Sequence, residues 1–274
     1  MKNKTIAFIG GGNMGRSLIG GLIADGYPPA KLRIADPDIG KLKELTAQFG
    51  IEASANNRRS ISGAEVVVLA VKPQVMKTVA TELAGSISNH TLVISIAAGV
   101  RTSALHHWLG SITPIVRAMP NTPALVSSGA TALYAADQVT PTQRDVAENI
   151  LRAVGLTLWL NDETLLDAVT AVSGSGPAYF FRLMEALEQA ATAQGLAPQQ
   201  ARLLVLQTAF GAAKMALESG QDPGALRAQV TSPGGTTERA LRVLDEHGIE
   251  RMIGEAVALA TLRAAELADQ FWEA

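Results

Sequence analysis

Short apolar runs alternate with amphipathic segments over the first 160 residues of the chain. Residues 66–71 are six consecutive apolar side chains, mostly Val, which is typical of a strand buried on both faces of a parallel sheet. Residues 14–24 instead carry apolar side chains at helical spacing. This alternation predicts βαβ units and a mainly parallel sheet. Strands are expected at residues 5–9, 32–35, 51–53, 66–71, 91–96, 115–118, 129–135 and 156–160, and helices at 14–24, 40–49, 102–109 and 141–154.

The pattern changes near residue 161, where runs of β-branched residues give way to Ala- and Leu-rich segments with helical spacing. Pro177, Pro198 and Pro223 lie near expected helix starts, where a missing N–H costs nothing. The change predicts a domain boundary near residues 161–165. These helices either form a self-contained bundle or cover one face with a second subunit, and periodicity leaves both interpretations open. They are expected at residues 163–171, 177–194, 198–219, 223–230, 235–246 and 249–271.

Composition and charge exclude several classes of function. The 274 residues include 23 Lys plus Arg and 25 Asp plus Glu, and a net charge of −2 argues against a general nucleic-acid-binding protein. The absence of Cys excludes disulfides, thiolate catalysis and Cys-based zinc sites, and the four His residues lack metal-ligand spacing, so no metal is expected. No apolar stretch is long enough for a membrane span or a signal peptide, so we expect a cytoplasmic protein without a membrane partner.

A glycine-rich segment with the pattern GxGxxG follows the first expected strand and precedes the first expected helix. In that context the pattern predicts a dinucleotide-binding turn, with the pyrophosphate at the helix N-terminus. Gly10 permits the tight turn, Gly12 lets the backbone approach the pyrophosphate, and Gly15 allows close helix–strand packing. The alternative is an ordinary strand–turn–helix without a ligand. The expected cofactor contacts here are Gly10, Gly11, Gly12, Asn13, Met14 and Gly15.

Asp36 follows the second expected strand and bears on the choice of cofactor. An acid at this position accepts hydrogen bonds from the adenosine ribose and repels a 2′-phosphate, which favours NAD. However, Pro37 follows directly, and nearby Lys and Arg side chains are available to a phosphate, so both NADH and NADPH stay open. The alternative role for Asp36 is an acid at the N-terminus of the second helix.

Three further expected strands end in segments that suit a cofactor. Because the carboxyl ends of parallel strands meet at one edge, where such sheets bind ligands, we expect these segments to lie together. Small residues after one strand suit a flat nicotinamide, and two prolines stiffen the loop that carries Asn121. Lys72 lies either near the cofactor phosphates or in solvent as a charge at a strand end. The expected contacts are Ala70, Val71, Lys72, Pro73, Ala97, Ala98 and Asn121.

Two segments of the helical half are rich in Ser, Thr and Gly. Residues 173–179 are expected to open the long helix with exposed N–H groups and hydroxyls, and residues 231–237 to open a later one. Helix N-termini of this composition hold carboxylates well, which predicts two contacts for an anionic substrate. The alternative for each is plain N-capping without a ligand.

Together these motifs resemble those of the pyrroline-5-carboxylate reductase family over nearly the whole chain. The resemblance implies an α/β protein, with an N-terminal Rossmann-like dinucleotide-binding domain over residues 1–162 and an all-α C-terminal dimerisation domain over residues 163–274. It implies a homodimer with a shared active site, and some relatives form rings of five dimers. The motifs are Phe8-Ile-Gly-Gly-Gly-Asn-Met14, Ala70-Val-Lys-Pro73, Ser95-Ile-Ala-Ala-Gly99, Met119-Pro-Asn-Thr-Pro123, Asp167-Ala-Val-Thr-Ala-Val-Ser-Gly-Ser-Gly-Pro-Ala-Tyr179 and Val230-Thr-Ser-Pro-Gly-Gly-Thr-Thr237.

The implied activity is the last step of proline biosynthesis, in which NADPH or NADH reduces the cyclic imine 1-pyrroline-5-carboxylate to L-proline. A protonated imine is already electrophilic, so hydride transfer needs orientation more than a strong acid. The resemblance implies that Asn57 contacts the adenosine side of the cofactor and that Thr237 is the catalytic residue, as proton donor or as orienting group. The implied substrate-binding residues are Thr170, Val172, Ser173, Gly174, Ser175, Ser232, Gly234, Gly235, Thr236 and Thr237.

Two other functions stay open. A related imine reductase or β-hydroxyacid dehydrogenase shares the two-domain plan, but the hydroxyacid enzymes typically use a Lys on the long inter-domain helix, and residues 177–194 contain none. A non-catalytic dinucleotide-binding protein would not need the Ser/Thr-rich segment at residues 231–237.

Overall fold

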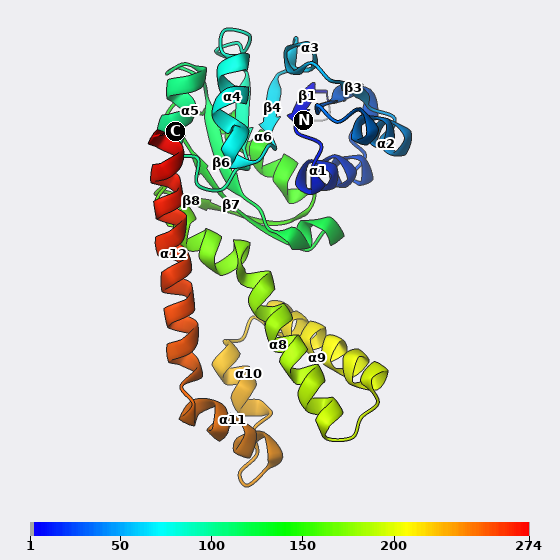
Figure 1. Cartoon of the computed structure of the whole chain (residues 1–274), viewed down its shortest axis with the longest axis vertical. Coiled ribbons are helices and arrows are strands. Elements are labelled where there is room, and N and C mark those ends of the chain that lie inside the picture. The colour runs from blue at the N-terminus through cyan, green and yellow to red at the C-terminus, as the bar shows by residue number, and fades with distance from the viewer. Residues whose placement is uncertain (1–2, 274) are drawn as a thin grey trace. The chain divides into compact units, whose positions relative to one another are not determined.

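The computed structural model describes residues 3–273 (Figure 1), so residues 1, 2 and 274 of the expected domains lie outside it. The chain forms two compact units. The first contains the residues up to Ser175 together with those from Leu259 onwards, and the second contains Gly176–Ala258. A helical C-terminal region therefore follows a sheet-containing N-terminal part, as the sequence predicts.

The first unit extends beyond the predicted boundary between residues 162 and 163 because the following residues pack on its core. Leu166 and Ala171 are buried. Near the end of the chain Ala268 is also buried, and Phe271 packs against Gly99 after β5. The division at residues 162 and 163, which rests on the change of sequence pattern, stays a prediction about domains.

An eight-stranded sheet forms the centre of the first unit, in the order β3-β2-β1-β4-β5-β6-β7-β8. Every neighbouring pair is parallel except β6 and β7, so the predicted mainly parallel sheet is confirmed. The strand order reverses between β1 and β4, and such a switch point is where open α/β sheets bind ligands. The strands are β1 (Ile6–Ile9), β2 (Leu32–Ala35), β3 (Glu52–Ser54), β4 (Val66–Leu69), β5 (Leu92–Ser95), β6 (Ile115–Met119), β7 (Gly129–Ala135) and β8 (Gly155–Leu160).

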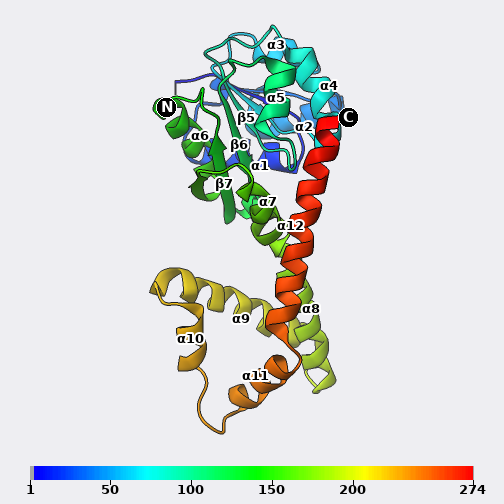
Figure 2. The same cartoon turned by 90° about the vertical axis from the view of Figure 1, so that its left-hand side faces the viewer.

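Helices cover both faces of this sheet, which explains why β4 is apolar throughout. Val66 and Val68 join a core cluster with Phe8, whereas Val67 and Leu69 join a second cluster on the other face. In both views α4 and α5 lie side by side (Figures 1 and 2). The helices of this unit are α1 (Asn13–Ala24), α2 (Ile39–Phe49), α3 (Asn57–Ile61), α4 (Pro73–Leu83), α5 (Thr102–Leu109), α6 (Pro141–Arg152), α7 (Leu165–Val169) and the end of α12 (Ile249–Glu273).

Helices α3 and α4 were not predicted from the sequence. Helix α4 begins at Pro73 and buries Met76, Ala80 and Leu83 at helical spacing, so its signal was present in the sequence. Helix α3 spans only five residues, too few for a periodic pattern.

The second unit consists of helices that bury almost nothing within the unit. Gly176 and Ala201 are its only buried residues, and the structure describes all of residues 176–258. Phe180, Phe181 and Phe210 each keep more than 60% of their surface exposed. Within the described residues, no helix combines the length and apolar character needed to cross a membrane. The helices are α8 (Gly176–Ala193), α9 (Pro198–Ser219), α10 (Pro223–Gln229), α11 (Thr236–Glu246) and the start of α12.

Candidate active site

The glycine loop between β1 and α1 has the geometry of an anion site. Gly10 has φ +105°, and a Cβ there would lie 2.6 Å from the carbonyl oxygen of Ala70. At Gly15 a Cβ would lie 2.5 Å from the carbonyl oxygen of Gly10, whereas Gly12 faces open space. Gly12 is also the N-cap of α1, and no side chain caps this helix. The N-terminal N–H groups of α1 are therefore available to a phosphate, and the space beside Gly12 lets one approach.

Asp36 holds the glycine loop from the end of β2. Its carboxylate is almost fully buried, and Oδ2 accepts a hydrogen bond from the Gly11 N–H at 2.7 Å. Its other oxygen accepts the Asp38 N–H at 2.9 Å and lies 3.8 Å from Lys41 Nζ. Asp38, which the sequence analysis did not single out, caps α2 by accepting N–H groups of Gly40 and Lys41. Asp36 therefore fixes the loop, and Asp38 takes the role of helix-capping acid that was the alternative for Asp36.

The three predicted loops lie at one edge of the sheet, because β4, β5 and β6 are consecutive parallel neighbours. Lys72 is exposed and precedes Pro73, the first residue of α4. Ala97 is buried after β5, and Ala98 is partly exposed. Asn57 opens α3 and donates from Nδ2 to Glu82 Oε2 at 2.8 Å. The three loops thus lie together at the edge of the sheet where cofactors bind in such folds. Asn57 is oriented by Glu82, a residue that the sequence patterns did not single out.

Asn121 uses both ends of its amide within the first unit. Its Oδ1 accepts the Ala130 N–H at 2.8 Å, and its Nδ2 donates to the carbonyl oxygen of Ser173 at 3.0 Å. Asn121 was predicted to offer its amide to a ligand. In the structure it links the loop after β6 to the segment that carries several of the predicted substrate contacts.

The prediction that residues 173–179 form an open helix N-terminus is wrong. Residues Thr170–Gly174 form a π-helical turn that continues α7, and α8 follows at Gly176. The N–H of Ser175 donates to the carbonyl oxygen of Thr170 at 2.8 Å, and the hydroxyls of Thr170 and Ser173 donate to carbonyls one turn earlier. The segment is therefore the interior of a helical run, so its first N–H groups are not all free.

The segment before α11 fits its prediction better. Gly235 is the N-cap of α11, no side chain caps the helix, and Thr236 is its first residue. Gly234 has φ +71° and donates its N–H to Glu238 Oε2 at 2.7 Å. Thr237 is half-buried and lies in the first turn. The first turn of α11 thus carries Thr236 and Thr237 and lacks a side-chain cap, which suits a carboxylate.

A buried ion pair that sequence patterns missed anchors the start of α7. Arg117 in β6 is 5% exposed, and its Nη1 lies 2.7 Å from Glu163 Oε1. The same carboxylate accepts both the N–H and the hydroxyl of Thr102 at 2.7 Å, so it caps α5. An Arg inside an otherwise apolar strand was the available signal, because a buried charge requires a partner.

Beside this pair lies a second charged cluster. Arg101 Nη2 is 3.6 Å from Asp167 Oδ2 and 3.8 Å from Asp269 Oδ1. Burial raises the pKa of Asp167, against the opposing effect of Arg101. The cluster joins α7 to the end of α12 within the first unit, next to the π-helical turn.

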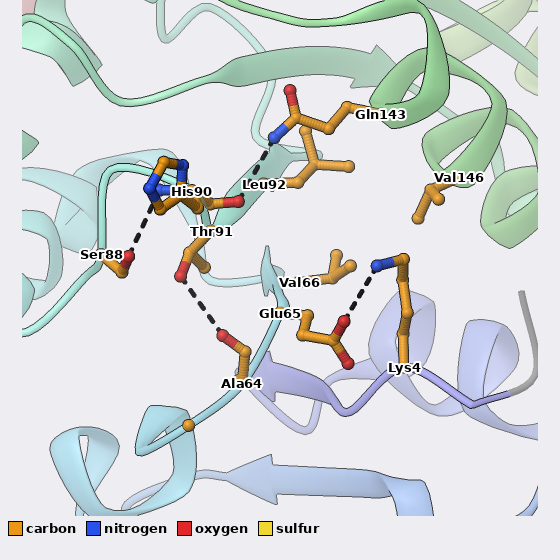
Figure 3. Close-up of a pocket in the computed structure, with 11 residues that line it drawn as sticks. Lys4, Ala64, Glu65, Val66, Ser88, His90, Thr91, Leu92, Gln143 and Val146 are labelled. Atoms are coloured by element: carbon orange, nitrogen blue, oxygen red, sulfur yellow. Dashed lines mark hydrogen bonds and ion pairs between the residues drawn. The ribbon is translucent and has the colours of Figure 1, made fainter.

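A hollow of about 340 Å³ lies at the opposite edge of the sheet (Figure 3). Its lining includes Lys4, Glu65 and Thr91 at the amino ends of β1, β4 and β5. Lys4 Nζ lies 2.9 Å from Glu65 Oε1, and the Thr91 hydroxyl donates to the carbonyl oxygen of Ala64. Because its polar groups pair with each other at the amino edge, this hollow is not the candidate site. Among the side chains that the structure describes, within residues 3–271, no group of three or more His, Cys, Asp or Glu is placed to hold a metal ion.

Sequence comparison matches two families. Residues 163–267 match the family described as pyrroline-5-carboxylate reductase dimerisation, and residues 5–99 match NADP oxidoreductase coenzyme F420-dependent. Pyrroline-5-carboxylate reductase from Pseudomonas aeruginosa is 49% identical over 270 residues, which cover 98% of this chain and 99% of the relative.

Solved structures agree with the sequence matches. Pyrroline-5-carboxylate reductase from Coxiella burnetii has a TM-score of 0.93 at 46% identity, covering 97% of this chain and 98% of the other. Pyrroline carboxylate reductase from Plasmodium falciparum, solved with NADP bound, has a TM-score of 0.87 at 28% identity, covering 98% and 99%. The likeness therefore spans both the glycine loop and the segment before α11.

Proposed function

The chain belongs to the pyrroline-5-carboxylate reductase family, and from this premise we propose that it reduces 1-pyrroline-5-carboxylate to L-proline with NADPH or NADH. The observation that carries the proposal is the match over 98% of the chain to a reductase at 49% identity. A match of that extent includes the loop that fits a dinucleotide and the loop that fits a carboxylate.

The residues around the glycine loop fit a dinucleotide. The N–H groups at the start of α1 would hold the pyrophosphate, next to the open space at Gly12, where no side chain competes. When bound, the reduced nicotinamide supplies the hydride that the imine carbon accepts. Asn57, Lys72 and Ala97 line the path along the carboxyl edge of the sheet, and Asp36 keeps the loop in shape through Gly11.

The loop before α11 supplies the substrate contacts. The uncapped N-terminus of α11 holds the carboxylate, with Ser232, Gly234, Gly235 and Thr236 around it. The Thr237 hydroxyl meets the ring nitrogen in this proposal, and either orients the imine or gives it a proton. The chain needs no stronger acid, because protonation of a cyclic imine already makes its carbon electrophilic.

The second unit forms a homodimer through its exposed apolar helix faces. Support comes from the match to a dimerisation family and from exposure of 58% or more at Phe181, Leu203, Leu204 and Phe210. Covering each such side chain contributes about 1.5–3 kcal/mol, and patches of this extent mark interfaces. A ring of five dimers and a cytoplasmic location are finer parts of the proposal that rest on the sequence alone. Light scattering separates a dimer from a ring of five dimers by mass.

The alternatives are not favoured. Helix α8 contains no Lys, so the acid/base group that β-hydroxyacid dehydrogenases typically carry on the long inter-domain helix is missing. A non-catalytic dinucleotide-binding protein has no need for the exposed N-terminus of α11. One assay tests all three functions: consumption of NADH and NADPH with pyrroline-5-carboxylate, an acyclic imine and a β-hydroxyacid as separate substrates. Turnover only with pyrroline-5-carboxylate is expected, and turnover only with a control, or none, would reject the proposal.

Replacing Thr237 by Ala tests the substrate side. We expect kcat for pyrroline-5-carboxylate to fall about tenfold to a hundredfold, as for loss of one orienting hydrogen bond at a reacting atom, with little change in cofactor Kd. Steady-state kinetics and fluorescence titration of NADPH measure the two quantities. Thr192→Ala on α8 is the matched control, because that hydroxyl only donates to the Glu188 carbonyl. Unchanged kcat in Thr237→Ala would remove the catalytic role.

Replacing Asp36 by Ser tests the cofactor side. Removing the carboxylate takes away repulsion of a 2′-phosphate, so the ratio of kcat/KM with NADPH to that with NADH should rise about tenfold. Loss of the bond to the Gly11 N–H affects both cofactors and cancels in this ratio. Asp36→Asn removes the charge at nearly constant size, and should raise the ratio too. A flat ratio in both variants would mean that Asp36 only holds the loop.

A further inference from the structure

Asn121 occupies the N-cap position of a short 3₁₀ turn, Thr122–Val126, but does not cap it. An Asn at such a position ordinarily accepts an N–H from the turn that follows. Here its side chain is turned elsewhere and is 9% exposed. Oδ1 meets the N–H of Ala130 in β7, and Nδ2 meets the Ser173 carbonyl. Instead of capping its own turn, the Asn121 side chain makes two hydrogen bonds to residues outside that turn.

The Ser173 carbonyl needs such a donor for a reason visible in the sequence. In a regular helix this carbonyl would accept the N–H four residues later, which belongs to Pro177, and proline has no N–H. A carbonyl that is shielded from water and lacks a donor destabilises the fold. Asn121 Nδ2 at 3.0 Å supplies the missing hydrogen bond. Asn121 therefore supplies the hydrogen bond that Pro177, which has no N–H, cannot give to the Ser173 carbonyl.

Packing at the next residue reinforces this contact. A Cβ on Gly174 would lie 2.7 Å from Cε of Met119, the last residue of β6, two positions before Asn121. The π-helical turn is thus held against the end of β6 and the loop after it by a hydrogen bond and by close contact. Turns of this kind are rare and are frequently found at functional sites. On this one Val172 stays 60% exposed and Ser175 partly exposed.

We propose that Asn121 is a positioning residue for substrate binding, which sets residues 172–175 in place by donating to the Ser173 carbonyl. The proposal rests on the proposed function, in which these residues lie next to the substrate. It assigns Asn121 to the substrate side, in place of the cofactor contact predicted from the sequence. Loss of the amide donor should then weaken binding of pyrroline-5-carboxylate and leave cofactor binding alone.

The first test replaces Asn121 by Asp, which keeps the size and an acceptor for Ala130 but sets an oxygen against the Ser173 carbonyl. KM for pyrroline-5-carboxylate should rise about tenfold, while Kd for NADPH stays within about twofold of wild type. Lowering the pH should reduce the KM defect, because the protonated acid can again donate a hydrogen bond. Asn149→Asp on α6 is the matched control, since its amide donates only to the Asp145 carbonyl at an exposed site.

The second test restores the hydrogen bond from the other side. Pro177→Ala provides a backbone N–H for the Ser173 carbonyl, so adding it to Asn121→Asp should recover most of the lost affinity. Asn121→Ser is a milder variant that should raise KM in the same direction if Asn121→Asp does not fold. Unchanged KM, an equal loss of NADPH affinity, or no recovery in the double variant would overturn the proposal. Wild-type protein without reductase activity would instead reject the proposed function.

Discussion

Similar apolar residues are buried in the first unit of the chain and exposed in the second. Phe8 in β1 is completely buried, whereas Phe210 in α9 leaves 62% of its surface exposed. In the first unit both faces of a sheet are covered by helices of the same chain. In the second unit the helices bury only Gly176 and Ala201 among residues 176–258.

The difference shows what an apolar pattern does and does not determine. A helix with an apolar stripe must bury it, but the pattern is the same whether the cover comes from its own chain or from another. The first unit completes its core alone. The helices of the second unit are as apolar as a protein core, but their apolar side chains are exposed. This is expected if a second copy of the chain covers them.

Truncation in the first unit should have the largest effect. Phe8→Ala removes a fully buried side chain from the main core cluster, and we expect a loss of about 3–5 kcal/mol in the free energy of unfolding. Urea unfolding followed by circular dichroism measures it. The loss should not depend on protein concentration. A dependence on concentration would mean that this core, too, is shared between copies.

A Phe→Ala substitution in the second unit should lower the free energy of unfolding by less, and should do so by weakening association between subunits. Phe210→Ala is expected to lower stability by about 1.5–3 kcal/mol, and more strongly in dilute protein, because the side chain is exposed in the single chain and the proposed dimer would cover it. Unfolding at several protein concentrations, with light scattering, measures both effects. Ile112→Ala is the control, because Ile112 is similarly exposed in the first unit and should change stability by less than about 0.5 kcal/mol. A Phe210 variant that behaves like this control would contradict the comparison.

The smallest expected effect is a pH dependence of the free energy of unfolding that arises from Asp167 in the first unit. Burial raises the pKa of Asp167 above its usual 3.8, so the folded state keeps a proton that the unfolded state has lost. Stability from this group therefore falls as pH rises from about that value through the raised pKa. Asp167→Asn removes the effect, so the variant should gain stability relative to wild type as pH rises through this window.

The contribution of Glu65 to stability should depend on pH in the opposite direction from that of Asp167. The hydrogen bond from Lys4 lowers its pKa, so its contribution is present above its usual 4.5 and is lost as pH falls. Urea unfolding of Glu65→Gln, Asp167→Asn and wild type between pH 4 and 7 separates the two. Parallel pH curves for Asp167→Asn and wild type would show that Arg101 compensates fully for burial.

Several features of the fold and site were predictable because their signals are local. All eight strands, the glycine turn and the start of the helix after Gly235 follow from apolar runs, helical spacing and special turn residues. Helix α4 was missed although Pro73 and its apolar spacing marked it. The helix start expected at residues 173–179 was wrong because Ser and Gly are equally compatible with a π-helical turn in mid-helix.

By itself, then, the sequence determined the βαβ order, the glycine turn and the family, since each depends on residues close together in the chain or on motifs. Only the tertiary structure decided that Asp36 holds Gly11, that Arg117 pairs with Glu163, and that Asn121 serves the Ser173 carbonyl. Each of these polar groups has several possible partners along the chain. Burial leaves it only the one within hydrogen-bonding distance, and that distance is set by the packing of the whole unit.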